Sequence, residues 1–522
     1  MAGYIANAVL LATVCLIGGL VYATIYNLYI SPLKVYPGPV SHAISRLPLD
    51  IARLRGNHHK HLRWLHDKYG PVARVAPGEV STIKGKSWAE IYGPRIGRLE
   101  MPKADLGHRL NGVHGILTAP TRGQHRRQRR MLAHAFSAQG LREQENRINH
   151  FVNLLMVGLT ERANIAPVDM AEWFHWTSFV RLANVAMDVI GDLAFGETFG
   201  CLESQSTHEW IDFVLKGFKA AVIFLMAEQW GVVGLLMHLI PNKMMEDRRK
   251  NFDFLVDKLQ RRVARGKDRG DFWDHVLKHD IHTVPVDLHS PETRGTTIEE
   301  MQSCAGDLVL AGSETTATLL SGVVFHLLQN PAVRERVTAE VRTTFADESS
   351  INLLSVTPDK LPYMDATLQE TMRRYPPVGL TVPRKIPLGG DTVDGVFLPE
   401  NTRISIPHII AYNSPYNFAR PLEFLPERWL PDRPQEFAND NPDNVFQPFS
   451  AGPRNCIGMN LARAEMRLVL SRLLWRFDLE KPAGAGTVWD GWLEGQKMWL
   501  LWFKDPLMVS LKTREGVVDV KA

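Results

Sequence analysis

Residues 449–458 read Phe449-Ser450-Ala451-Gly452-Pro453-Arg454-Asn455-Cys456-Ile457-Gly458. A thiolate that ligates a metal inside a flat macrocycle needs a loop that brings its sulfur close under the ring. Glycine lacks a Cβ, so Gly452 and Gly458 let the backbone pass close to the ring and to itself. Amide hydrogens near Cys456 can donate to its sulfur and keep it a thiolate. The stretch therefore predicts that Cys456 is an axial metal ligand.

The residues after the cysteine are expected to form a helix over about 458–476, whose dipole would favour a negative sulfur at its start. Two other interpretations of Cys456 stay open here: an inert buried cysteine in a glycine-rich turn, or a nucleophile activated by a histidine. Four cysteines in 522 residues are too few for a secreted disulfide framework. Cys15, Cys201 and Cys304 are therefore expected to be small buried hydrophobic residues.

The spacing of the cysteine loop resembles the haem-binding loop of the cytochrome P-450 family, F-x-x-G-x-R-x-C-x-G. From average composition, a match of this kind arises by chance on the order of once in ten thousand such chains. The resemblance implies haem b as cofactor, with Cys456 as the axial ligand of its iron. It also implies that Phe449, Gly452, Arg454 and Gly458 belong to the cofactor-binding loop.

Two further stretches resemble the family's structural motifs. Glu370 and Arg373 match E-x-x-R, and they lie on one helix face because they are three residues apart. Arg428 lies in a segment similar to the family's P-E-R-F. The resemblance implies that these three residues form a buried ion triad that braces the cysteine loop. Removing one member of such a triad would strand a buried charge.

A basic segment resembles the family's W/H-x-x-x-R helix through His125 and Arg129. The resemblance implies that these two residues, with Arg384 and Arg454, bind the haem propionates, and a guanidinium suits a carboxylate because it binds as a planar fork. Three neighbouring arginines are then expected to point elsewhere. They are Arg126, Arg127 and Arg130. These arginines form either a solvated helix face or a docking patch for an acidic flavin reductase.

Residues 296–328 carry the clearest helix signals, with a capping box within Thr296-Thr297-Ile298-Glu299-Glu300 and a stop at Asn330-Pro331. The middle of this helix, 311–316, resembles the family's oxygen-activation motif, A/G-G-x-D/E-T-T. The resemblance implies that Gly312 opens space for O₂, that Thr315 hydrogen-bonds it and that Glu314 relays protons. From the residues alone, a kinked helix with a satisfied polar pair is an equal alternative.

The rest of the chain predicts a mainly α fold with minor β. Apolar residues at helical spacing occur at about 140–160, 250–265 and 361–374. Short strands are expected at about 71–76, 79–84 and 403–407, and a hairpin near the C-terminus. No change of composition divides 40–522, and the resemblance covers the chain after Lys34. Residues 34–522 are therefore expected to form one large haem domain with the cytochrome P-450 fold.

Residues 1–33 are expected to be a transmembrane anchor. The sequence has no charged residue before Lys34, and residues 4–30 are long enough to cross a hydrocarbon core of about 30 Å. A secretory signal is the alternative, but a basic n-region is missing and the apolar run is too long. Positive charges follow the span, which places the catalytic domain in the cytosol. A single-pass protein of the endoplasmic reticulum membrane is therefore expected, with residues 36–39 as a stiff connector.

The function implied is a haem-thiolate monooxygenase that activates O₂ with electrons from an NADPH-cytochrome reductase and oxidises a lipophilic small molecule. A haem-thiolate isomerase or dehydratase, and a non-enzymatic haem sensor or carrier, are the alternatives. The net charge of +4 and the lack of an Arg/Lys stripe exclude nucleic acid as a partner.

Within the family, the sequence is similar to fungal membrane-bound enzymes of secondary metabolism, near the isotrichodermin C-15 hydroxylase type. Relative to that group, residues 180–187 form an extra segment, which is either a real loop or a splice-boundary artefact. The substrate cavity is expected to be walled by about 101–120, 222–241, 308–316 and 378–383, of which 222–241 is also apolar enough to dip into a bilayer surface.

Overall fold

The computed structural model describes residues 2–95, 97–104, 111–174, 185–199, 209–266, 269–279, 295–484 and 486–517. Its α-helices are α1 (Ala2–Ile25), α2 (Val40–Ile44), α3 (Leu47–Leu54), α4 (His58–Tyr69), α5 (Ser87–Ile91), α6 (Arg122–Leu132), α7 (Ala138–Arg162), α8 (Met170–Phe174), α9 (Val185–Phe195), α11 (Glu209–Gln229), α12 (Val233–Leu239), α13 (Asn242–Ala264), α14 (Asp274–His279), α15 (Ile298–Gln329), α16 (Pro331–Thr344), α17 (Pro362–Arg374), α18 (His408–Tyr412), α19 (Met459–Arg476), α20 (Gly486–Asp490) and α21 (Trp492–Gly495).

The strands are short, and they form small sheets. They are β1 (Val72–Ala76), β2 (Glu79–Thr82), β3 (Val168–Asp169), β4 (Arg384–Lys385), β5 (Asp391–Val393), β6 (Val396–Leu398), β7 (Arg403–Ser405), β8 (Phe477–Glu480), β9 (Lys497–Met498), β10 (Trp502–Phe503) and β11 (Met508–Thr513). The largest described sheet has the order β1-β2-β7-β4. The expectation of a mainly helical fold with minor β is confirmed.

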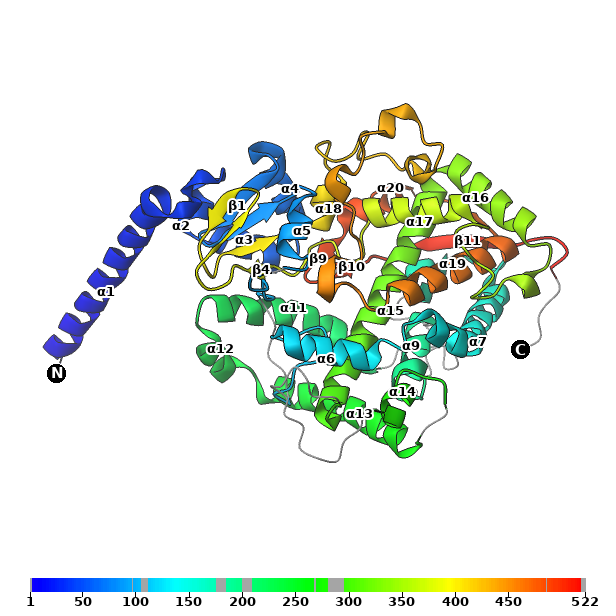
Figure 1. The fold of residues 1–522 in the computed structure, drawn as a ribbon, viewed down its shortest axis with the longest axis horizontal. Helices are drawn as coiled ribbons and strands as arrows, with labels where there is room; N and C mark the ends of the chain where they lie inside the picture. Colours follow the sequence, from blue (N-terminus) through cyan, green and yellow to red (C-terminus); the bar gives the residue numbers. More distant parts are fainter. Residues whose placement is uncertain are drawn as a thin grey trace.

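Helix α15 crosses the body of the molecule, as Figure 1 shows. Its start is fixed by the predicted capping box, in which Thr297 accepts the N–H of Glu300 and the Glu300 side chain returns to the Thr297 backbone. It ends at Asn330, directly before a proline. Most of its side chains are buried, so it forms the centre of the hydrophobic core. Any cavity against its middle is therefore deep inside the protein.

The sheet β1-β2-β7-β4 positions one side of that cavity. β2 pairs with β7 in parallel, and β4 pairs with β7 antiparallel, with Arg384 opposite Ile404. Lys103 forms a single bridge with Arg384, which brings the segment before α6 to the same edge. Lys103 in the loop and Arg384 in β4, which are 281 positions apart in the sequence, are thus neighbours in the structure.

Helix α1 projects away from the body (Figure 1). In the described part of the chain, two helical segments are long and apolar enough to cross a membrane, Thr13–Ile30 and Ile298–Gln329. The second is α15, which is largely buried in the core, whereas no described residue of the first is buried. Cys15 is exposed on α1, so the expectation that it is buried was wrong because α1 leaves the body. Cys304 is buried in α15 as expected.

The connector after α1 packs against β1. The backbone N–H of Arg74 donates to the carbonyl of Pro37 at 2.8 Å. A Cβ on Gly38 would lie 2.5 Å from the Arg74 carbonyl oxygen, so only glycine allows this approach. Leu33, at the end of the expected anchor, is buried against the body. Of the extra segment 180–187, residues 180–184 lie outside the described residues. Cys201 lies outside them as well.

Candidate active site

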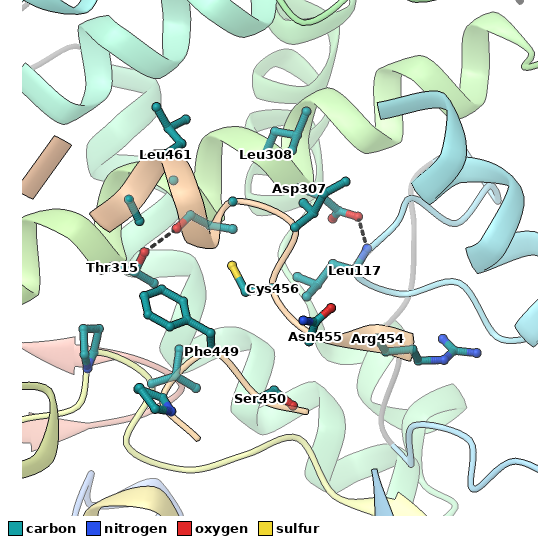
Figure 2. A pocket seen from close by; sticks show the side chains of 18 of the residues that line it. Leu117, Asp307, Leu308, Thr315, Phe449, Ser450, Arg454, Asn455, Cys456 and Leu461 are labelled. Carbon is teal, nitrogen blue, oxygen red and sulfur yellow. Dashed lines mark hydrogen bonds between the residues drawn. The ribbon is translucent and has the colours of Figure 1, made fainter. Parts of the chain in front are cut away.

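A cavity of about 320 Å³ lies between α15, α9 and the loop before α19. Figure 2 shows the sulfur of Cys456 near its centre, with Thr315 and Phe449 on one side and Asn455 and Arg454 on the other. Most of the cavity wall is apolar. The cysteine loop and the middle of α15 thus face one internal space, as the sequence predicted.

The cysteine loop is held by backbone hydrogen bonds. The N–H of Cys456 donates to the carbonyl of Phe449 at 2.9 Å, which closes the loop. Burial raises the pKa of the Cys456 thiol, whereas the N–H of Gly458 donates to the sulfur and Arg129 lies near it, and both lower that pKa. Helix α19 begins at Met459, so its positive end faces the same sulfur. Burial is the largest of these effects and leaves the pKa of the thiol raised, whereas the nearby donors oppose that rise and favour the thiolate.

The two glycines of the loop do different things. Gly452 has φ +74°, and a Cβ there would lie 1.9 Å from the carbonyl oxygen of Tyr92. Only glycine fits both the left-handed backbone and this contact. Gly458 has φ −82°, and a Cβ there would meet Phe136 at 3.8 Å, an ordinary contact. The backbone therefore requires a glycine at Gly452 and not at Gly458.

A cluster of cationic groups lines one part of the cavity. It comprises the four expected residues and one that the sequence analysis missed: His125, Arg129, Arg384, Arg454 and Lys103. Burial and the neighbouring cations lower the pKa of His125 to about 3. They lower that of Lys103 to about 7. Like charges this close together favour an anion between them.

Some members of this cluster also have protein partners. Arg454 pairs with Glu100 at 2.6 Å and donates to the carbonyl of Ala119. Arg384 donates to the carbonyl of Met101 at 3.2 Å, and its buried Nε has no hydrogen-bond partner among the described residues. An unsatisfied buried guanidinium nitrogen is costly, which indicates that a ligand acceptor belongs beside it.

Helix α15 presents Thr315 and Gly312 to the cavity. The Thr315 hydroxyl donates to the carbonyl of Ala311 at 2.7 Å. A Cβ on Gly312 would lie 2.8 Å from Cδ1 of Ile190, in α9. The resemblance explained Gly312 by room for O₂, but the glycine is also needed for the packing of α15 against α9. Ile190 and Val189 line the cavity, and nothing in the sequence pattern pointed to them.

Glu314 does not line the cavity, although its neighbour Thr315 does. Its Oε1 lies 2.7 Å from Nζ of Lys504, in the segment after β10. Both side chains are 2 % exposed. The predicted proton-relay residue is therefore held in a buried ion pair, and its partner was not found from the sequence.

Glu370, Arg373 and Arg428 are brought together as the resemblance implied. Arg373 forms two hydrogen bonds to the Glu370 carboxylate at 2.8 and 2.9 Å, and Arg428 lies 3.1 Å from it. All three side chains are fully buried. Arg373 also donates to the carbonyl of Tyr412, whose hydroxyl accepts the N–H of Gln447. The triad is thus connected to the segment that leads into the cysteine loop.

Two expectations about the surroundings were wrong. Arg127 is not on a basic surface: it is buried and forms two hydrogen bonds with the Glu300 carboxylate at the start of α15. Residues 222–241 contribute no described residue to the cavity wall, and α11 instead contacts α3 and α12. The other three expected walls each contribute residues, among them Ile116, Leu308 and Val378.

Comparison with known proteins agrees with this geometry. The sequence profile described as Cytochrome P450 matches residues 37–488, most of the chain. This chain belongs to the cytochrome P450 family. The expected fold, the haem-thiolate cofactor and the monooxygenase activity of this P450 are confirmed at the level of the family.

Its relatives are fungal enzymes. It is 42 % identical over 491 residues to averantin hydroxylase of Dothistroma septosporum, covering 94 % of this chain and 88 % of that one. It is 41 % identical to averantin hydroxylase of Aspergillus parasiticus, covering 94 % of each chain. It is 38 % identical to versicolorin B desaturase of Aspergillus parasiticus, covering 95 % of this chain and 96 % of that one. The fungal secondary-metabolism type is thus confirmed, and the likeness to isotrichodermin C-15 hydroxylases stays an expectation.

The residues of this P450 fit haem b. The cavity offers one sulfur ligand at Cys456, apolar walls for a porphyrin, and a cationic cluster for two propionates. The unpartnered Nε of Arg384 and the lowered pKa of His125 both indicate that an anion completes the cluster. Iron bound there would have Cys456 as its protein ligand.

Proposed function

We propose that this P450 is a membrane-anchored monooxygenase that oxidises a lipophilic small molecule with O₂ and with electrons from an NADPH-dependent reductase. The observation that carries the proposal is the shared cavity, in which Cys456 and Thr315 face one apolar space. Bound haem supplies O₂ binding and O–O cleavage at a thiolate-ligated iron. The other steps fall to side chains of the chain itself.

Thr315 is the residue that would hydrogen-bond the oxygen. Its hydroxyl is already at the cavity surface. Because the hydroxyl donates its hydrogen to the carbonyl of Ala311, its oxygen lone pairs can still accept a hydrogen bond from another group. Glu314 would supply protons from the adjacent helix position. His125, Arg129, Arg384 and Arg454 would hold the propionates.

The alternatives find less support. A haem-thiolate isomerase or dehydratase needs no hydroxyl to deliver protons to oxygen, yet Thr315 lines the cavity. A haem sensor or carrier needs no apolar substrate space and no buried carboxylate beside that hydroxyl. The relatives carry the names of hydroxylases and a desaturase. Both alternatives therefore rank behind the monooxygenase.

The substrate would be largely apolar. Leu308, Ile116 and Val378 offer hydrocarbon walls, and buried apolar area is what such walls recognise. Among the polar groups at the cavity, Asp307 accepts the N–H of Leu117 at 2.9 Å (Figure 2). Averantin and versicolorin B, which appear in the names of the relatives, are the first compounds to test.

The membrane would hold the enzyme by residues 1–33, followed by the catalytic domain 34–522. The apolar, exposed α1 supports an anchor. Leu235 and Met237 of α12 are exposed apolar side chains. Trp230, shortly before α12, donates to Asp50 of α3, which follows the connector. This places α12 on the side of the anchor, where its apolar side chains would add lipid contact. The positive charges after the span support a single-pass topology with a cytosolic catalytic domain, and the membrane we propose is that of the endoplasmic reticulum.

The reductase would dock on the surface near α6. Arg122 and Arg126 are exposed on this helix, and a cationic face steers an acidic partner. Arg127 is excluded from this surface because it pairs with Glu300. Helix α6 also carries Arg129, which contacts the cysteine loop, so docking here would bring electrons close to the haem site.

Two experiments test the proposal. Metabolite profiling of a fungal host with and without this chain should reveal one lipophilic compound that accumulates and one oxidised product that disappears on deletion. In the purified protein, Cys456→Ser should abolish the thiolate-type absorption of the carbonyl complex, with Cys304→Ser as the matched control. Retention of that absorption in the Cys456 variant would refute the ligand assignment.

A further inference from the structure

Glu314 and Lys504 form an ion pair between the middle of α15 and the C-terminal part of the chain. Nζ of Lys504 lies 2.7 Å from Oε1 of Glu314 and 2.8 Å from Oγ1 of Thr318. The Thr318 hydroxyl donates to the same carboxylate oxygen at 3.3 Å. Two donors therefore fix one oxygen of Glu314, and neither donor lines the cavity.

This pair is expensive to bury. A buried ion pair is often less stabilising than well-packed apolar side chains of similar volume. Both side chains are 2 % exposed. Two apolar residues at these positions would serve the fold equally well. The chain instead has a lysine and a carboxylate next to Thr315, which indicates that the pair has a role in the reaction.

The surroundings make the proton of this pair easy to move. Burial raises the pKa of Glu314, and the Lys504 charge and the two hydrogen bonds lower it. Burial likewise lowers the pKa of Lys504, and Glu314 opposes this. Tyr375, whose hydroxyl donates to Gln496, also interacts electrostatically with this carboxylate. The ionised and neutral forms of the pair are thus closer in free energy than in water.

The pair also lies close to solvent along the chain. The Lys504 side chain is buried, but the next residue, Asp505, is exposed. The backbone at Lys504 is therefore one residue from the surface. On the other side of the carboxylate, the next residue of α15 is Thr315, which faces the cavity.

We propose that Lys504 is a positioning residue for proton delivery: its ammonium group fixes Glu314 beside Thr315 and restores the proton that Glu314 gives up. The inference rests on the proposed function of Glu314. In the ion pair, the Glu314 carboxylate first takes a proton from the Lys504 ammonium and then passes it towards the cavity. The resulting amine takes one proton from solvent water, which restores the ion pair, so protons and charge balance over each turnover.

The test compares five variants of the full-length enzyme with its reductase: Glu314→Gln, Lys504→Met, both together, Lys504→Arg and Lys512→Met. Lys512 forms an exposed pair with Glu480 at 2.8 Å and serves as the control. The measured quantities are product and hydrogen peroxide formed per NADPH, with the compound identified by profiling, at several pH values. The substrate dissociation constant from the haem spectrum is measured in parallel.

Lys504→Met should lower product per NADPH on the order of a hundredfold, the lower end of the range for loss of a proton donor, with an unchanged dissociation constant. The double variant should equal Glu314→Gln, because Lys504 acts through Glu314. Lys504→Arg should recover much of the yield, and Lys512→Met should behave as the parent. As pH rises, the melting temperature of Lys504→Met should fall below that of the double variant. The reason is that Lys504→Met leaves a buried carboxylate without its cation, whereas the double variant has no carboxylate there.

The outcomes separate the two proposals. A parental yield in Glu314→Gln would overturn the role of Glu314 itself. An impaired Glu314→Gln with a parental Lys504→Met would overturn the role of Lys504 alone. A double variant much worse than Glu314→Gln would also overturn it, because Lys504 would then act on the fold and not through Glu314.

Discussion

The guanidinium group of Arg129 donates to both oxygens of Asn455: Nη1 lies 2.6 Å from the main-chain oxygen and Nη2 lies 2.7 Å from Oδ1. Because Asn455 precedes Cys456, these two bonds fix α6 directly to the cysteine loop. One side chain thereby orients the ligand loop and adds a charge to the propionate cluster. Arg129 therefore contacts the loop that carries the expected iron ligand and belongs to the cluster expected to hold the propionates.

Arg129→Met should lower the haem content of the purified protein, because it removes a cation of the cluster and loosens the loop. Hydrogen bonds to charged groups contribute about 1.5–3 kcal/mol each. The haem-to-protein absorbance ratio measures the effect. Arg126→Met, on an exposed position of the same helix, is the control. An equal loss of haem in both variants would contradict a specific role.

Thr315→Ala should separate electron use from product formation. NADPH consumption should continue while product falls on the order of a hundredfold, and hydrogen peroxide should take up the difference. Thr343→Ala removes the same type of bond, a threonine hydroxyl to the carbonyl four residues earlier, on the exposed helix α16. This control should keep the parental yield. Tight coupling in Thr315→Ala would rule out its role towards oxygen.

Glu370→Gln should destabilise the protein by about 3–5 kcal/mol, because it removes the carboxylate that two buried guanidinium groups share, while Arg428 keeps its pair with Asp440. Urea unfolding, followed by tryptophan fluorescence, gives the free energy. Glu480→Gln removes an exposed pair with Lys512 and should change stability by less than about 1 kcal/mol. Similar values for the two variants would show that the triad does not brace the fold.

Stability should fall as the pH drops below about 6.5. Burial lowers the pKa of His66 to about 4, and that of His59 and His408 to about 4. Between these values and the ordinary histidine pKa, the unfolded chain binds protons that the folded protein does not, so acid favours unfolding. Above about pH 7 these groups are neutral in both states and contribute no slope.

His66→Gln tests this slope on one residue. His66 bonds Gly70 and Ser81 through its two ring nitrogens, and glutamine replaces them without a titrating group. The free energy of urea unfolding at about pH 7 and about pH 5 should differ less in this variant than in the parent. The exposed His150→Gln should keep the parental difference. An unchanged slope in His66→Gln would show that His66 does not contribute.

The parts of the site that depend on local spacing could be predicted from the sequence. The loop around Cys456 has fixed spacing because one short segment must place sulfur and amides together. The helix 298–329 was found from its capping box and its apolar face. The contacts within such segments are set by the local backbone, so the order of residue types is enough to identify them.

Contacts between distant segments could not be predicted in this way. Lys504 meets Glu314 across 190 residues, and no periodicity relates them. Ile190 meets Gly312 for the same reason. Arg127 stands in a run of arginines typical of a solvated face, yet the start of α15 supplies a carboxylate that buries it. In each case the partner is decided by how the elements pack, which a single sequence does not display.

The contact between Arg74 and Asn27 has a consequence for how the enzyme meets other molecules. The guanidinium group of Arg74, buried in β1, donates to the carbonyl of Asn27 at 2.7 Å and to its side chain at 2.9 Å. Asn27 lies in the π-helical turn Tyr26–Ile30 that follows α1, so these hydrogen bonds join the end of the apolar helix directly to the sheet. If α1 anchors the enzyme in a bilayer, this contact would limit the orientations of the catalytic body while it diffuses in the plane of the membrane. Encounters with another protein of the same membrane would then repeat a single approach geometry, and the search for a productive collision would become two-dimensional.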